Sequence, residues 1–212
     1  MKILCYGDSN TWGFSPIDGS RFSEDIRWPA VMGRCLGEPH TVIEDGLNGR
    51  TLCTFATEGD PLNGAEHLPS VIHAYKRPEL VILYLGINDL FVDPQISVPV
   101  MAGRLERVIE QISQAAPSTS LLVMSPLPVN IDEEYHGMYH RQIENSLLLT
   151  PAMQEIADKL RCGFLDTSQI ITASRRDGVH IEAEEHIKLG LHLCVQVREL
   201  TVRTNELHIG RE

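Results

Sequence analysis

The run Leu80-Val81-Ile82-Leu83-Tyr84-Leu85 constrains the fold of this chain more than any other segment. It is apolar throughout, whereas a strand with one face in water alternates apolar and polar residues. A continuous run of this length is typical of a central parallel strand that is covered on both faces. Four further short apolar runs are bounded by turn residues and predict additional strands, at residues 3–6, 41–44, 121–124 and 163–165.

Helical patterns separate these runs. Residues 28–36, 100–116 and 182–200 carry apolar side chains at helical spacing. Thr150-Pro151 predicts another helix start, because threonine caps helices and proline fits their first turn. Strand and helix thus alternate five times, which predicts an α/β domain with a five-stranded, mostly parallel sheet. Two stretches rich in turn residues are expected to be irregular binding loops, at 58–78 and 125–139.

The composition limits the function classes that the chain can serve. Its 212 residues suit one domain, 1–212, and its net charge of −11 argues against nucleic acid or an anionic membrane as the main partner. The five cysteines include no C-x-x-C pair, so we expect reduced, mostly buried thiols. The apolar segment at the N-terminus is too short for a signal peptide, and no run is long enough to cross a membrane. We therefore expect a cytoplasmic protein.

Polar turns follow the predicted strands. Gly7-Asp8-Ser9 follows the first, Gly46-Leu47-Asn48-Gly49 the second and Gly86-Ile87-Asn88-Asp89 the third. Because ligands bind beyond the carboxyl ends of the strands in an open α/β sheet, these turns are expected to open onto one site.

Ser9 is the candidate nucleophile of this site. A serine hydroxyl attacks poorly until a base removes its proton. A Gly-flanked turn would present both the oxygen and the backbone N–H of Ser9 to the same substrate. The alternative is that Ser9 caps the helix that begins just after it.

Asn88 and Gly49 are candidate donors to a developing oxyanion. The side-chain N–H of Asn88 would stabilise negative charge on a tetrahedral intermediate. Gly49 lacks a side chain, so its backbone N–H would approach the substrate closely. The alternatives are a turn asparagine and an ordinary loop glycine.

The spacing Asp177-x-x-His180 carries the clearest local signal. A carboxylate three residues before a histidine reaches its Nδ1 within one turn, so that Nε2 faces the nucleophile. The alternative is a capping aspartate beside a surface histidine. Most of the other eight histidines are expected at the surface, since none has such a partner at a strand-end loop.

With these residues in view, the chain resembles the SGNH superfamily of hydrolases, also called the GDSL family. The family's serine, glycine, asparagine and histidine match Ser9, Gly49, Asn88 and His180, and the resemblance covers about residues 2–200. Asn10 stands where the family's name-giving leucine would be, a change expected to be minor. Asp8 and Asp89 are then expected to support loops by accepting backbone N–H bonds.

Within the family, the bacterial arylesterase and acyltransferase branch is the most similar, through stretches such as Cys5-Tyr6-Gly7-Asp8-Ser9-Asn10-Thr11-Trp12-Gly13 and Leu62-Asn63-Gly64-Ala65. This resemblance implies a flavodoxin-like three-layer α/β/α sandwich, no metal and no organic cofactor. It also implies a two-step acyl-enzyme mechanism and homo-oligomers whose neighbouring subunits narrow the active-site mouth.

The leading hypothesis is a serine esterase that acts on small esters, with catalytic Ser9, Asp177 and His180. The N–H groups of Ser9 and Gly49 and the amide of Asn88 would form the oxyanion hole, and hydrolysis and acyl transfer both stay open. Three aromatic residues could line the substrate pocket, although core packing is the simpler explanation for each: Trp12, Phe14 and Phe91.

Several alternatives remain. A metal-dependent phosphoesterase would use Asp8, Asn88, Asp89 and His180 as ligands, but the paired ligand spacing that such sites need is missing. A non-enzymatic binding domain would not need the complete set of catalytic groups. Within the same family, the alternatives are a lysophospholipase, a thioesterase or a carbohydrate acetylesterase.

Overall fold

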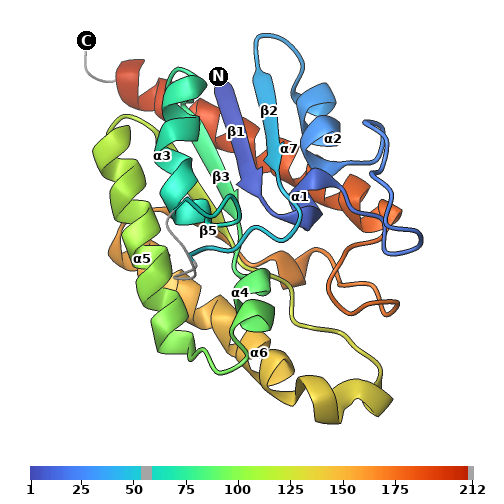
Figure 1. Cartoon of the computed structure of the whole chain (residues 1–212). Helices are drawn as coiled ribbons and strands as arrows, with labels where there is room; N and C mark the ends of the chain where they lie inside the picture. Colours follow the sequence, from blue (N-terminus) through green and yellow to red (C-terminus); the bar gives the residue numbers. More distant parts are fainter. Residues whose placement is uncertain (54–58, 210–212) are drawn as a thin grey trace.

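The computed structural model describes the backbone of residues 1–53 and 59–209 and the side chains of residues 1–53 and 59–200. Its centre is a sheet of five parallel strands in the order β2-β1-β3-β4-β5, so the predicted fold class is confirmed (Figure 1). The strands are β1 (Lys2–Gly7), β2 (Thr41–Gly46), β3 (Leu80–Tyr84), β4 (Ser120–Met124) and β5 (Gly163–Leu165).

Helices cover both faces of the sheet. They are α1 (Ser9–Trp12), α2 (Trp28–Leu36), α3 (Gly64–Ala74), α4 (Ile87–Val92), α5 (Val98–Ala115), α6 (His136–Lys159) and α7 (Ala183–Ile209). Two short 3₁₀ turns lie at Glu133–Tyr135 and Thr167–Gln169. Figure 1 shows α3 and α5 on one side of the sheet and α2 and α7 on the other. The helices that the structure describes contain no apolar stretch of the length needed to span a membrane.

The continuous apolar run of β3 is explained by two separate cores. Val81 and Leu83 pack into the core beneath α3, α5 and α6, whereas Leu80 and Ile82 pack into the core beneath α2 and α7. Successive side chains of a strand point to opposite faces, so a strand between two helical layers needs apolar residues at every position. The core of this fold therefore follows directly from the sequence pattern.

Three local predictions are wrong in whole or in part. In the stretch predicted to be irregular at 125–139, residues 133–135 form a 3₁₀ turn and α6 begins at His136. Thr150-Pro151 does not open a helix, because α6 begins at His136 and runs through Pro151. Pro151 is exposed, while buried Leu149 and Met153 hold the helix on the core. The stretch predicted to be irregular at 58–78 contains α3; residue 58 lies outside the described residues. A buried stripe of Ala65, Leu68 and Ile72 stabilises α3 despite Pro69.

The prediction of five reduced cysteines is also wrong, because Cys35 of α2 and Cys194 of α7 form a disulfide. Their Cα atoms lie 6.1 Å apart, although 159 residues separate them in sequence. The two helices approach closely at Gly190, where a Cβ would lie 2.6 Å from the carbonyl oxygen of Trp28. This long-range helix contact is not visible in the sequence pattern.

Candidate active site

The first candidate residue lies in a turn that depends on glycine. Gly7 ends β1, Asp8 caps α1 and Ser9 is the first residue of α1. A Cβ on Gly7 would lie 2.7 Å from the carbonyl oxygen of Tyr84 in the neighbouring strand, so no larger residue fits there. Ser9 is therefore not the helix cap, and its side chain is available for another role.

A chain of hydrogen bonds joins Ser9 to the segment before α7. Nε2 of His180 lies 2.9 Å from Oγ of Ser9, and Nδ1 of His180 lies 2.7 Å from Oδ2 of Asp177. Gly178, at φ +75°, allows the tight turn between the aspartate and the histidine. The structure thus brings together three residues that the sequence spreads over 171 positions.

Asp177 is held as a carboxylate in this turn. Its Oδ1 accepts the backbone N–H groups of Val179 at 3.0 Å and of His180 at 2.9 Å. Burial by itself would raise the pKa of Asp177, but these bonds and the bond from the imidazole together lower it. A charged Asp177 accepts a hydrogen bond from Nδ1–H of His180, which leaves the unprotonated Nε2 to face Ser9.

Gly49 lies just after β2 and Asn88 just after β3, and these two strands flank β1, which Ser9 follows. Nδ2 of Asn88 donates one hydrogen bond to the carbonyl oxygen of Arg50 at 2.9 Å, and an amide NH₂ has a second N–H to offer. Gly49 has φ +80°, a conformation that favours glycine. Within the part of the chain that the structure describes, no backbone carbonyl accepts the N–H of Ser9 or of Gly49. Three donors are thus available at this edge of the sheet.

A family model described as the GDSL-like Lipase/Acylhydrolase family matches residues 5–193. The chain belongs to this family. Est24, a carbohydrate acetylesterase from Sinorhizobium meliloti, is 28% identical, with 94% of this chain and 99% of that chain covered and a TM-score of 0.84. A further carbohydrate acetylesterase family member from S. meliloti is 32% identical (93% and 97% covered, TM-score 0.83). An aryl esterase from M. smegmatis is 30% identical (94% and 99% covered, TM-score 0.83). A comparison with curated proteins finds no match.

The two carboxylates next to the site support loops in this acylhydrolase, as predicted. Oδ1 of Asp8 accepts the backbone N–H of Asn10 at 2.9 Å. Asp89 accepts the N–H of Leu52 at 2.7 Å and binds Arg104 at 2.9 Å. Burial raises the pKa of Asp8 to about 7, although the bond from Asn10 opposes the shift. Among the described residues, no cluster of His, Cys, Asp and Glu side chains is arranged to hold a metal ion.

The three aromatic candidates have different surroundings. The ring of Phe14 stacks on the imidazole of His180, with centroids 4.2 Å apart. Trp12 instead lies under the guanidinium of Arg21, and Phe91 packs near Tyr139. Among the ring contacts of the described residues, Phe14 is the candidate that stacks on a residue of the Ser9–His180–Asp177 hydrogen-bond chain.

The sequence predicts most of the other histidines at the surface, but His186 is buried with no exposed area. It lies on the first turn of α7, edge-on to Phe22 at a centroid distance of 5.3 Å. Neither ring nitrogen has a hydrogen-bond partner among the described residues. Burial, with repulsion from His180 and Arg27, lowers its pKa to about 3. The apolar spacing of α7 was the signal for this position, since His186 lies one turn before Leu189 and Gly190.

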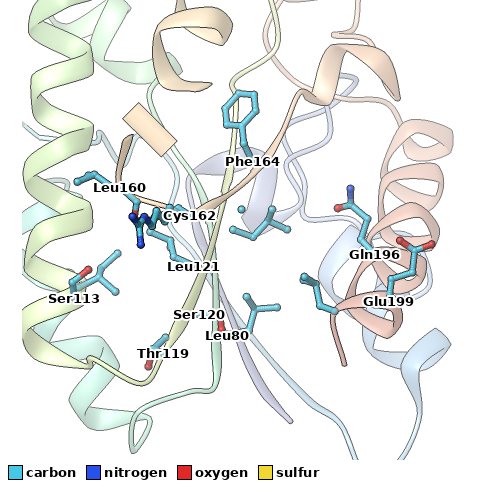
Figure 2. A pocket seen from close by; sticks show the side chains of 15 residues that line it. Leu80, Ser113, Thr119, Ser120, Leu121, Leu160, Cys162, Phe164, Gln196 and Glu199 are labelled. Carbon is cyan, nitrogen blue, oxygen red and sulfur yellow. The ribbon is translucent and has the colours of Figure 1, made fainter. Parts of the chain in front are cut away.

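A cavity of about 530 Å³ lies at the opposite end of the sheet from Ser9, where β3, β4 and β5 begin. Figure 2 shows Gln196 and Glu199 of α7 on one side of it and Leu121 and Cys162 on the other. It contains none of the residues of the hydrogen-bond chain. The candidate active site of this acylhydrolase is therefore the strand-end site around Ser9, not this cavity.

Proposed function

We propose that this carboxylic ester hydrolase attacks its substrates with Ser9, using His180 as the general base and Asp177 to orient it. The observation that carries the proposal is the continuous chain from Ser9 Oγ through His180 to Asp177, with distances of 2.9 and 2.7 Å. Both distances are in the normal range of hydrogen bonds. These three side chains need no rearrangement for His180 to take the proton of Ser9.

Acylation follows from this geometry. Nε2 of His180 takes the proton of Ser9 Oγ while the oxygen bonds to the ester carbonyl carbon. The carbonyl oxygen becomes negative and accepts hydrogen bonds from the N–H groups of Ser9 and Gly49 and from the second N–H of Asn88. His180 then returns the proton to the leaving alcohol as the C–O bond breaks. The acyl group stays on Ser9 as an ester.

Deacylation repeats these steps with a new nucleophile. His180 removes a proton from water, the hydroxide adds to the acyl carbon, and Ser9 leaves with the proton that His180 returns. An alcohol in place of water would give acyl transfer. We propose hydrolysis of small carboxylic esters as the main reaction, with transfer as a side reaction at high alcohol concentration.

The substrate proposal is supported by the neighbours and by the burial of the site. The similar structures are named as carbohydrate acetylesterases and an aryl esterase, which supports a short acyl group. Ser9 is only 5% exposed, and Phe14 lies beside His180, so a short acyl chain fits more easily than a long one. Phe14 is the aromatic residue that we assign to the pocket wall; for Trp12 and Phe91 the contacts support local packing.

Of two predictions about the protein in the cell, the homo-oligomer stays a proposal and the cytoplasmic location is revised. An apolar stripe on α7, formed by Ile187, Leu191 and Val195, is exposed and supports a homo-oligomer. A cytoplasmic location was expected from reduced thiols. Because disulfides are rare in the cytosol, the Cys35–Cys194 bond supports an oxidising compartment instead.

The decisive experiment compares the wild type with Ser9→Ala and with Ser23→Ala, which changes an exposed serine. We expect Ser9→Ala to lose hydrolysis of p-nitrophenyl acetate and labelling by a fluorophosphonate probe, while Ser23→Ala keeps both. A folded Ser9→Ala enzyme with full activity would refute the assignment. Loss of wild-type activity in EDTA would revive the metal-dependent phosphoesterase.

A series of p-nitrophenyl esters of increasing acyl length, run with and without a competing alcohol, tests the substrate proposal. We expect kcat/KM to be highest for acetate and to fall with chain length. A maximum at long chains would favour a lysophospholipase or thioesterase.

A further inference from the structure

Asn10, directly after Ser9, makes a contact that a leucine at this position would lack. The residue is 3% exposed and is held by three separate hydrogen bonds. Its N–H donates to Asp8 at 2.9 Å, and its carbonyl oxygen accepts the indole N–H of Trp28 at 3.1 Å. Its side-chain Nδ2 donates to the carbonyl oxygen of Val179 at 3.2 Å. The first two bonds hold the backbone of Asn10 in place, so the position from which its side chain donates to Val179 is also fixed.

The carbonyl of Val179 belongs to the peptide that joins Val179 to His180. Within the residues that the structure describes, this bond and the Ser9–His180 bond are the two hydrogen bonds between the turn 7–13 and the loop 174–181. Asp177 fixes the N–H groups of Val179 and His180 from inside the loop. Asn10 fixes the carbonyl between them from the side of the nucleophile. The backbone of His180 is thereby tied to the helix that carries Ser9.

The orientation of the Asn10 amide follows from the same contact. If the amide were rotated, its oxygen would face the carbonyl oxygen of Val179, and two acceptors would meet. In the observed orientation Oδ1 is buried and has no hydrogen-bond partner among the described residues. An unsatisfied buried acceptor destabilises the fold, so the amide is retained here at a cost in stability.

We propose that Asn10 is a positioning residue that sets the distance and angle between His180 Nε2 and Ser9 Oγ. This inference rests on the proposed role of those two residues in ester hydrolysis. A leucine would fill a similar volume but would donate nothing to Val179. Of the two hydrogen bonds described between the turn 7–13 and the loop 174–181, the Ser9–His180 bond would then be left. Small displacements of a catalytic group cost rate steeply.

His180 has two tasks in acylation, to remove the proton of Ser9 and to return a proton to the leaving alcohol. The second task matters more for some esters than for others. In acylation, His180 must return its proton to the leaving alcohol as the carbonyl C–O bond breaks. Ethanol is a poor leaving group and needs that proton, whereas p-nitrophenolate leaves as an anion. A misplaced His180 should therefore slow acylation by ethyl acetate more than acylation by p-nitrophenyl acetate. A variant with a merely less stable fold would lose both activities in the same proportion.

The test uses Asn10→Leu, which keeps the volume, and Asn10→Ala, whose smaller side chain fits where leucine would not. The matched control is Asn145→Leu, because Nδ2 of Asn145 also donates to a backbone carbonyl, that of Ile96, at 2.9 Å on another part of the protein. We expect both Asn10 variants to lose about tenfold in kcat/KM on p-nitrophenyl acetate and roughly a hundredfold on ethyl acetate. Asn145→Leu should keep the wild-type ratio between the two esters.

The outcomes separate this inference from the proposed function. Equal losses on both esters, or no loss in folded Asn10→Leu and Asn10→Ala, would overturn the positioning role while Ser9→Ala still abolishes activity. If Ser9→Ala retains activity, the proposed function itself fails.

Discussion

The buried imidazole of His186 makes a quantitative prediction about acid stability. Burial, with repulsion from His180 and Arg27, lowers its pKa from 6.5 to about 3 in the folded chain. As the pH falls, the unfolded chain binds a proton on this imidazole near pH 6.5, whereas the folded chain binds it only near pH 3. The folded state therefore loses stability as the pH falls below 6.5. The free energy of unfolding at pH 5 is therefore about 2 kcal/mol lower than at pH 8. The difference between 6.5 and 5 is about 1.5 pKa units, and each unit corresponds to about 1.4 kcal/mol.

His186→Leu removes this linkage. Urea unfolding at pH 8 and pH 5 should show that the wild type loses about 2 kcal/mol more between the two values than the variant does. Other titrating groups cancel in this difference, because both proteins contain them. His73→Leu, which removes an exposed histidine of α3, is the control and should behave as the wild type. A His186→Leu variant with the wild-type pH dependence would show that the buried ring finds a partner when it is protonated, and would refute the reasoning.

Three further changes test the site and its frame. Burial raises the pKa of Asp8 to about 7, so the folded chain holds that proton between pH 3.8 and about 7 and loses stability as the pH rises through this window. Asp8→Asn, which keeps an oxygen for the N–H of Asn10, should remove this loss in urea titrations; an unchanged pH dependence would contradict it. Asp177→Asn should lower kcat roughly 10³–10⁴-fold with KM little changed, because an amide beside Nδ1 favours the wrong tautomer of His180. A loss below tenfold would show that the carboxylate is not needed there. Titration of thiols in denaturant should find three before reduction and five after it, since Cys35 and Cys194 are joined. Five thiols in the unreduced protein would rule the bond out, and cleaving it should cost roughly 3–5 kcal/mol of stability.

The sheet was predictable because its signals are local. A strand covered on both faces must be apolar at every position, and β3 meets this condition over its whole length. The helix in the stretch predicted to be irregular at 58–78, α3, spans only 11 residues and contains Pro69, so its turn residues outweigh its buried stripe as a sequence signal. The helix start predicted at Thr150-Pro151 is wrong for a different reason. There, a local capping pattern was overridden by the burial of Leu149 and Met153 on a helix that was already running.

Contacts between distant segments could not be derived from the sequence in the same way. The spacing of Asp177 and His180 predicts their own bond, because three residues fix the reach. Nothing local to Cys35 or Cys194 indicates that two helices on the same face of the sheet bring them within 6.1 Å. The same holds for Asn10, whose side chain meets a carbonyl 169 positions away.

The position after Ser9 shows where a family pattern and a physical account diverge. A pattern names the residue type that is usual at a position, so an asparagine in place of leucine counts as a small departure. The structure gives that asparagine a donor role that leucine does not have, and places the acceptor on the peptide before His180. Because Trp28 and Asp8 hold the backbone of Asn10 from two other directions, the side chain transmits the position of α1 to the histidine loop. Replacing Asn10 should therefore change the geometry of the hydrogen bonds between Ser9, His180 and Asp177, although Asn10 is not one of these residues. The effect of the replacement should appear in how kcat/KM depends on the leaving group, and not in stability alone.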